Sequence, residues 1–251
     1  MNVFKYLKIL YSGKEALINQ VSIFSLVGIM VISLSEYLTY LLGNLSSSFL
    51  GYAPASHFVL AGYLFVGLML LIYFIGYSFD VAKFSQIGNF SQISLASYKT
   101  FVKMFPISIA WVLYLLFATV LGLCLFQIGS VLYCIYFAII ICFLPFIQLI
   151  SVKFSENFNY HKQYFSLVYL LKVVDKAFGK VVLLTLETIA LGVLPATVMY
   201  FMIKNSNLIK DIYIQLACRL GSICVGVYFA IILIFVYMLG LADISKDKLS
   251  D

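Results

Sequence analysis

The sequence predicts an all-α integral membrane protein, a helical bundle of about six transmembrane helices with three interfacial amphipathic helices. Its 251 residues are 64% hydrophobic and 10% charged, against roughly 45–50% and 25% in ordinary soluble domains. The apolar residues form long blocks that, at about 1.5 Å per residue, can cross a hydrocarbon layer about 30 Å thick. Lysines are concentrated in alternate connecting segments. We expect one integral membrane domain over residues 1–251.

Six apolar blocks define the expected spans. They cover residues 21–43, 58–77, 105–126, 131–150, 181–203 and 216–240. The first block follows Lys5, Lys8 and Lys14, as the core of a signal peptide would, but its apolar run is too long and no small-residue cleavage site follows it. We therefore expect it to remain as a helix. Pro145 and Pro195 lie inside spans and are expected to bend their helices.

The lysines predict the orientation of the spans. Lys204 and Lys210 fall on one side, whereas the other side carries Lys5, Lys8, Lys14, Lys83, Lys99, Lys103, Lys153, Lys162, Lys172, Lys176, Lys180, Lys246 and Lys248. By the positive-inside rule the lysine-rich side is cytoplasmic. Both chain termini are then cytoplasmic, and the expected location is a bacterial inner membrane or a plasma membrane.

The cytoplasmic face is expected to attract membrane lipid. Seven acidic residues share that face and leave it a formal charge of +6, which favours anionic headgroups by about 1 kcal/mol per well-placed basic residue. These residues are Glu15, Asp80, Glu156, Asp175, Asp243, Asp247 and Asp251. Asp80 ends the second span, where we expect water to reach it. The lysines lie among Phe and Tyr residues, so we expect a membrane surface and no nucleic acid as partner.

Three cytoplasmic segments have the pattern of amphipathic helices in the headgroup plane. The apolar stripe of the first contains Phe4, Leu7, Tyr11 and Ile18. The second contains Phe84, Ile87, Phe90, Leu95, Tyr98 and Val102, and the third contains Tyr164, Val168, Leu171, Val174 and Phe178. Each segment precedes one outward and one inward span.

This layout is compatible with an internal repeat. KFSQIGNF at Lys83 to Phe90 matches KFSENFNY at Lys153 to Tyr160 in its Lys, Phe, Ser and Asn positions. The repeat units would cover residues 1–80, 81–150 and 151–245, and they would be parallel because the matching segments lie on the same side. Convergence is the alternative, because cytoplasmic links between apolar helices tend to be amphipathic.

The chain resembles the polytopic membrane families grouped around the membrane domain of glycerophosphodiester phosphodiesterases. The resemblance rests on the pair Gly76–Tyr77 with the amphipathic segment after it, and on KFSENFNYHKQYFSLVYLLKVVDKAFGKVVLL at Lys153 to Leu184. It implies a membrane-embedded helical domain. In the phosphodiesterases the chemistry belongs to a separate soluble barrel, for which this chain leaves no room, so the resemblance transfers no catalytic residue.

Three ionisable residues within the spans are candidates for a polar site. A charged side chain in a span costs about 2.5–3.5 kcal/mol on insertion scales. Glu36 and Arg219 lie at similar depth in the outer part of the first and last spans, and could form either a structural ion pair or a proton or substrate site. Glu187 lies near the cytoplasmic end of its span and follows Lys180 on roughly the same face, where it could extend toward the interface or act as a functional acid.

Other residue types point to packing. The five cysteines (Cys124, Cys134, Cys142, Cys218 and Cys224) lie inside spans without CxxC spacing, and neither His57 nor His161 has a partner at ligand spacing, so we expect no disulfide and no metal. Small residues recur at four-residue spacing in three ladders, which suits close helix contact. The ladders are Ala118 and Gly122, Gly192 and Ala196, and Cys218, Ser222 and Gly226.

The sequence leaves the molecular function open among three classes. A noncatalytic membrane component or subunit that organises lipid or partner proteins fits the three interfacial helices and the small-residue faces. A transporter or permease for a small molecule or lipid fits the acids and prolines within the spans. A lipid-modifying enzyme is the third class. Nucleotide-binding and protease motifs are absent, and we expect no enzyme activity and no cofactor.

Overall fold

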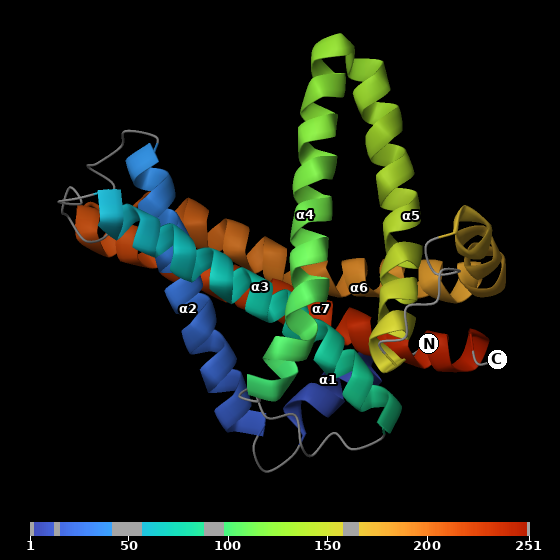
Figure 1. Cartoon of the computed structure of the whole chain (residues 1–251). Helices are drawn as coiled ribbons and strands as arrows, with labels where there is room; N and C mark the ends of the chain where they lie inside the picture. Colours follow the sequence, from blue (N-terminus) through green and yellow to red (C-terminus); the bar gives the residue numbers. More distant parts are fainter. Residues whose placement is uncertain (1–2, 13–15, 42–56, 88–97, 158–165, 250–251) are drawn as a thin grey trace. The chain divides into compact units, whose positions relative to one another are not determined.

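A computed structural model of the chain describes residues 3–12, 16–41, 57–87, 98–157, 166–249, and these are helical apart from short turns (Figure 1). The helices are α1 (Val3–Tyr11), α2 (Ala16–Leu41), α3 (His57–Ile87), α4 (Tyr98–Ile128), α5 (Ser130–Asn157), α6 (Leu167–Ser206) and α7 (Ile212–Lys248). In the part of the chain that the structure describes, no strand occurs. The all-α prediction is confirmed.

Six of the described helices, α2 to α7, are long and apolar enough to cross a membrane. Their apolar stretches cover Ala16–Ser35, Ala61–Ala82, Ser108–Ile128, Ser130–Ser155, Leu167–Ser206 and Tyr213–Lys248. The six predicted spans are thereby confirmed in number and order. Helices α6 and α7 exceed the expected length: measured along its axis, the 40-residue helix α6 is about 60 Å long, twice the thickness of a hydrocarbon layer.

The chain forms two compact units, and each is assembled from distant parts of the sequence. Unit 1 contains residues 1–9, 75–188 and 235–251, and unit 2 contains residues 10–74 and 189–234. Helices α1, α3, α6 and α7 therefore contribute one part to each unit. The predicted repeat over 1–80, 81–150 and 151–245 remains a prediction.

The core of unit 1 is built around the carboxyl-terminal part of α7. From Phe235 to Ser245 this helix is buried on nearly every side, and only Tyr237 and Asp243 are partly exposed. A helix that is enclosed on all faces must be apolar on all faces, and the run FVYMLGLADIS largely meets that condition. Fully buried residues from the other helices of unit 1 include Val81, Ala82, Leu149, Val152, Val181 and Leu184.

Helices α4 and α5 form a long antiparallel hairpin within unit 1, with its turn at Gly129 (Figure 1). The small residues Ala118 and Gly122 lie against α5, as their spacing predicted: Tyr136 Oη donates a hydrogen bond to the Ala118 carbonyl oxygen at 2.8 Å. A Cβ atom at Gly122 would lie 3.3 Å from the Tyr136 ring. In the most apolar stretch of each helix only 6% of the residues are buried. Most of the hairpin surface therefore requires lipid or another protein as cover.

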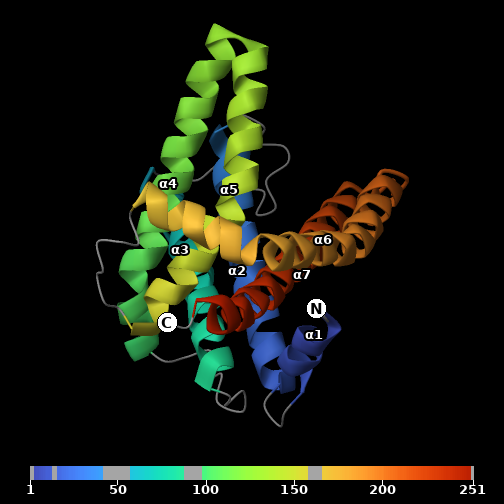
Figure 2. The same ribbon diagram turned by 90° about the vertical axis from the view of Figure 1, so that its right-hand side faces the viewer.

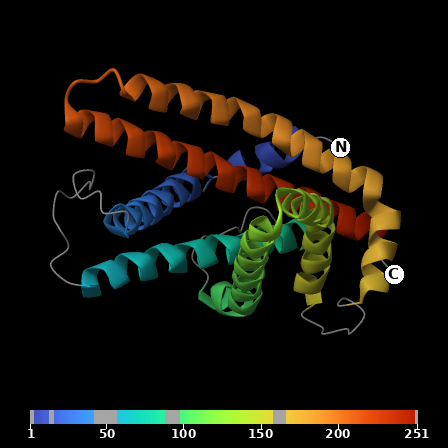
Figure 3. The same cartoon turned by 90° about the horizontal axis from the view of Figure 1, so that it is seen from above.

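Glycines allow close contact between α6 and α7. Figure 3 shows the two helices side by side. In unit 2, Gly192 of α6 lies against Leu233 of α7, and Gly226 of α7 lies against Met199 of α6. In unit 1 the same two helices bring Leu184 against Gly240. Glycine and a large side chain thus alternate at about seven-residue spacing along both helices, which is two helical turns. The predicted ladders at Gly192 and Gly226 are contact sites.

The three amphipathic segments are arranged differently from the prediction. The first divides into α1 and the start of α2, and α1 buries Val3 and Tyr6 while the expected stripe residue Phe4 is 68% exposed. The second lies mainly outside the described residues, and its two ends continue α3 and α4. The third is helical from Leu167 and continues into the fifth span without interruption. Their location in the headgroup plane remains a prediction.

Candidate functional site

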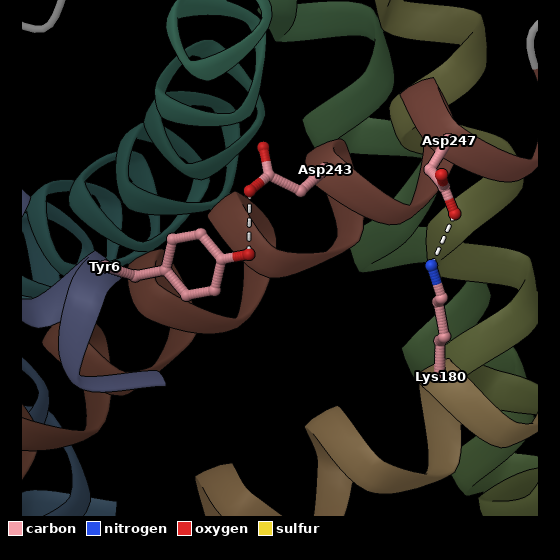
Figure 4. Close-up of polar contacts among 4 residues, drawn as sticks. All are labelled: Tyr6, Lys180, Asp243 and Asp247. Atoms are coloured by element: carbon pink, nitrogen blue, oxygen red, sulfur yellow. Dashed lines mark hydrogen bonds and ion pairs between the residues drawn. The ribbon is translucent and has the colours of Figure 1, made fainter. Parts of the chain in front are cut away.

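A polar cluster lies beside the buried part of α7 in unit 1 (Figure 4). Tyr6 of α1 donates a hydrogen bond from Oη to Asp243 Oδ2 at 2.8 Å. Lys5 Nζ lies 3.5 Å from the same oxygen. The Tyr6 side chain is buried, whereas the Asp243 side chain is 39% exposed. The contacts attach α1 to α7, and bonds to a charged acceptor at such a site are worth about 1 kcal/mol after allowance for solvent.

Burial and neighbouring acids raise the pKa of Tyr6. The largest cause is desolvation, because ionisation would place a phenolate in a buried position. The hydrogen bond to Asp243 and the negative charges of Asp243 and Glu187 raise the pKa further. Tyr6 therefore stays protonated and acts as a donor. Because the charge of Glu187 acts on Tyr6, the predicted site residue Glu187 lies in the region of this cluster.

Glu187 itself is partly buried, and its Oε2 atom is buried. Its expected neighbour Lys180 lies about two helical turns earlier on α6. Lys180 forms an ion pair with Asp247 of α7 (Figure 4). Asp243 and Asp247 are four residues apart on α7, which places them on one side of the helix. The Asp243 carboxylate binds Tyr6 of α1, and the Asp247 carboxylate binds Lys180 of α6. This acidic pair therefore connects three helices of unit 1.

The predicted pair Glu36 and Arg219 belongs to unit 2. Glu36 lies on α2, but its side chain is outside the described residues. Arg219 is exposed and donates a hydrogen bond from Nη2 to Asn207 Oδ1 in the turn between α6 and α7. The ion pair with Glu36 therefore stays a prediction, and Asn207 is a partner of Arg219 that the sequence did not indicate.

A second polar network, which the sequence did not indicate, lies in unit 2. Tyr228 of α7 donates from Oη to Gln20 Oε1 at 2.7 Å, and Gln20 Nε2 donates to the Leu10 carbonyl oxygen at 3.0 Å. The hydroxyl groups of Tyr11 and Tyr228 are also hydrogen-bonded, at 3.0 Å. Gln20 is 9% exposed. The network connects the start of α2 to the middle of α7, and it satisfies polar groups that would be costly to bury alone.

The expectation that water reaches Asp80 was wrong. Asp80 was expected to lie where water reaches it, but it is only 6% exposed. The reason is that α3 continues to Ile87 and the other helices of unit 1 cover this part of it. The polar cluster around Asp243 could have been expected from one sequence feature. Asp243 and Asp247 are four residues apart and lie beside Lys246 and Lys248. Nothing in the sequence singled out Tyr6.

The length and apolar character of six described helices define the chain as a multi-pass helical membrane protein. Among the described residues, no three His, Cys, Asp or Glu side chains gather where they could hold a metal ion. No protein-family model, curated protein or solved structure compared with the chain matches it.

Proposed function

We propose that the protein is a noncatalytic membrane component, a subunit or organiser whose apolar helices contact lipid or partner proteins and whose cytoplasmic face attracts anionic headgroups. The observation that supports this function best is the α4–α5 hairpin. Only 6% of the residues in the most apolar stretch of α4, and 6% of those in α5, are buried. Both helices therefore expose an apolar surface. Its exposed residues include Leu113, Leu116, Phe117, Ile135, Ile139 and Ile141.

The ionisable side chains support the same proposal. Asp243, Asp247 and Arg219 form contacts with Tyr6, Lys180 and Asn207 respectively. Contacts of this kind hold helices and their turns in place. The resemblance to the membrane domain of glycerophosphodiester phosphodiesterases is part of the same proposal, as is the cytoplasmic location of both termini.

A transporter or permease is the second candidate. It is favoured by Glu187, whose Oε2 is buried and whose charge reaches Tyr6. An acid within a span is a common element of proton and ion pathways. In this reading Glu36 and Arg219 would form a second polar position toward the outer side.

Detergent extraction and reconstitution into liposomes distinguish the two candidate functions. After extraction in mild detergent, mass spectrometry should find lipid or one partner protein bound in a fixed ratio, and liposomes that contain the purified chain should show no proton or solute flux above protein-free liposomes. A flux that Glu187→Gln or Glu36→Gln abolishes, while Lys8→Gln leaves it intact, would overturn the proposed function in favour of the transporter.

A further inference from the structure

The amino-terminal part of α6, residues 167–180, has three distinct faces. Val173 and Ala177 are each 1% exposed and pack into unit 1, and the same buried row continues beyond this part through Val181 and Leu184. A second, exposed stripe is apolar: Leu167, Leu171 and Phe178 are 70%, 52% and 58% exposed. The third face is also exposed and carries Lys172, Asp175, Lys176 and Lys180.

The lysines on the charged face are not equivalent. Lys180 is neutralised by its ion pair with Asp247. Lys176 and Lys172, about one and two turns before Lys180, form no ion pair or hydrogen bond with any residue that the structure describes. Their ammonium groups are four residues apart and so lie on one side of the helix. Each can donate three hydrogen bonds to oxygen acceptors.

The apolar stripe places these ammonium groups at a membrane surface. Leu167, Leu171 and Phe178 need hydrocarbon cover, and Val168, which is 62% exposed, lies between this stripe and Lys172 around the helix. Figures 2 and 3 show that α6 curves within its amino-terminal part. Because the 40 residues of α6 are about twice the number that a hydrocarbon layer requires, part of this helix extends beyond the acyl chains. A helix with one face on protein, one apolar face and one basic face fits the boundary between acyl chains and headgroups.

We propose that Lys172 and Lys176 bind the phosphate of an anionic phospholipid headgroup whose acyl chains cover Val168 and Leu171. This inference rests on the proposed membrane function and names the headgroup site within it. A lipid phosphate offers the anionic oxygens that two ammonium groups require, and its acyl chains offer the cover that the apolar stripe requires. Asp175, on the same face, opposes the binding and limits its strength.

The test is native mass spectrometry of the full chain in detergent, titrated with phosphatidylglycerol or phosphatidylcholine. The wild type should retain phosphatidylglycerol in preference. Each lysine should contribute about fivefold in affinity, so Lys172→Gln with Lys176→Gln should reduce phosphatidylglycerol affinity about 25-fold and leave phosphatidylcholine affinity unchanged. Asp175→Asn should increase phosphatidylglycerol affinity several-fold, a gain that misfolding cannot produce.

The matched control is Lys204→Gln with Lys210→Gln, which removes two exposed lysines at the other end of α6 and beyond it. This control should retain the wild-type preference. Equal retention by wild type and the Lys172/Lys176 variant, or an Asp175→Asn variant without gain, would overturn the site. Displacement of the lipid by millimolar inorganic phosphate would also overturn it. The flux measurement that tests the proposed function is independent of each of these outcomes.

Discussion

Asp211 ends the turn between α6 and α7 and caps α7. Its Oδ1 accepts hydrogen bonds from the backbone N–H groups of Tyr213 and Ile214, at 2.9 and 3.0 Å. These N–H groups have no acceptor within the helix, and the Asp211 carboxylate supplies one. Its negative charge also interacts favourably with the positive end of the helix dipole. The same carboxylate would contribute nothing in the middle of the helix.

We expect Asp211→Ala to lower the free energy of unfolding by about 1 kcal/mol, because two N–H groups lose their acceptor. Asp211→Asn keeps a side-chain oxygen at the cap and should stay within a few tenths of a kcal/mol of the wild type. Denaturation in a single detergent, followed by circular dichroism, measures both variants. Equal losses for Ala and Asn would show that the cap is not what Asp211 supplies.

Tyr6 makes the stability of the protein depend on pH in the alkaline range. Its pKa in the folded chain is raised above the ordinary value of about 10, so the folded state holds the proton more tightly than the unfolded state. The stabilisation is complete below about pH 10 and is lost as the pH rises toward the folded pKa. We expect the stability difference between the wild type and Tyr6→Phe to be constant from pH 7 to 9 and to shrink above pH 10. A difference that grows above pH 10 would contradict the raised pKa.

The contact between α6 and α7 in unit 1 depends on the missing side chain of Gly240. A Cβ atom there would lie 2.5 Å from Leu184 Cδ1, and Leu184 is fully buried, so its side chain has no space to move into. We expect Gly240→Ala to destabilise the chain by about 1–3 kcal/mol through overpacking. Thermal unfolding in detergent measures the loss.

Gly179 is the matched control, since a Cβ atom at this position meets nothing within 4 Å. It also lies within α6, where alanine has the higher helix propensity by about 1 kcal/mol. Gly179→Ala should therefore leave the stability unchanged or raise it. If Gly179→Ala destabilised the chain as much as Gly240→Ala does, close contact with Leu184 could not be the cause.

The length of α6 and α7 has a consequence for how the spans are delimited. Because both helices are continuous over more residues than a bilayer requires, the hydrophobic run and the helix do not end together. The excess at the amino end of α6 and the carboxyl end of α7 forms much of the packed core of unit 1. This is why Asp243, Asp247 and Lys180 interact there as side chains of helices and not of loops.

For the whole molecule, the lysine distribution predicts which ends of the helices face the cytoplasm. In a variant whose five native cysteines are replaced, a membrane-impermeant thiol reagent applied to sealed cells should label Leu208→Cys, which is 80% exposed in the turn after α6. It should not label Lys8→Cys or Lys248→Cys, although both positions are exposed.

Lysis of the cells is the control, after which all three cysteines should react. Ser245 would be a poor reporter because it is 0% exposed, so a cysteine there would be unreactive from either side. Labelling of Lys8→Cys or Lys248→Cys in sealed cells would contradict the cytoplasmic location of the termini.

The sequence by itself determined the membrane class and the number and order of the six apolar helices, although not their limits. These follow from local quantities, namely the length and polarity of each apolar run. It also located small residues such as Gly122, Gly192 and Gly226, whose spacing marks a face of a helix whatever lies opposite. Only the tertiary structure decided which partner each face meets: Tyr6 with Asp243, Lys180 with Asp247, and Gln20 with Tyr228. These partners are 67 to 237 residues apart in the chain, and a pairing at that separation depends on how helices pack, which no local pattern encodes.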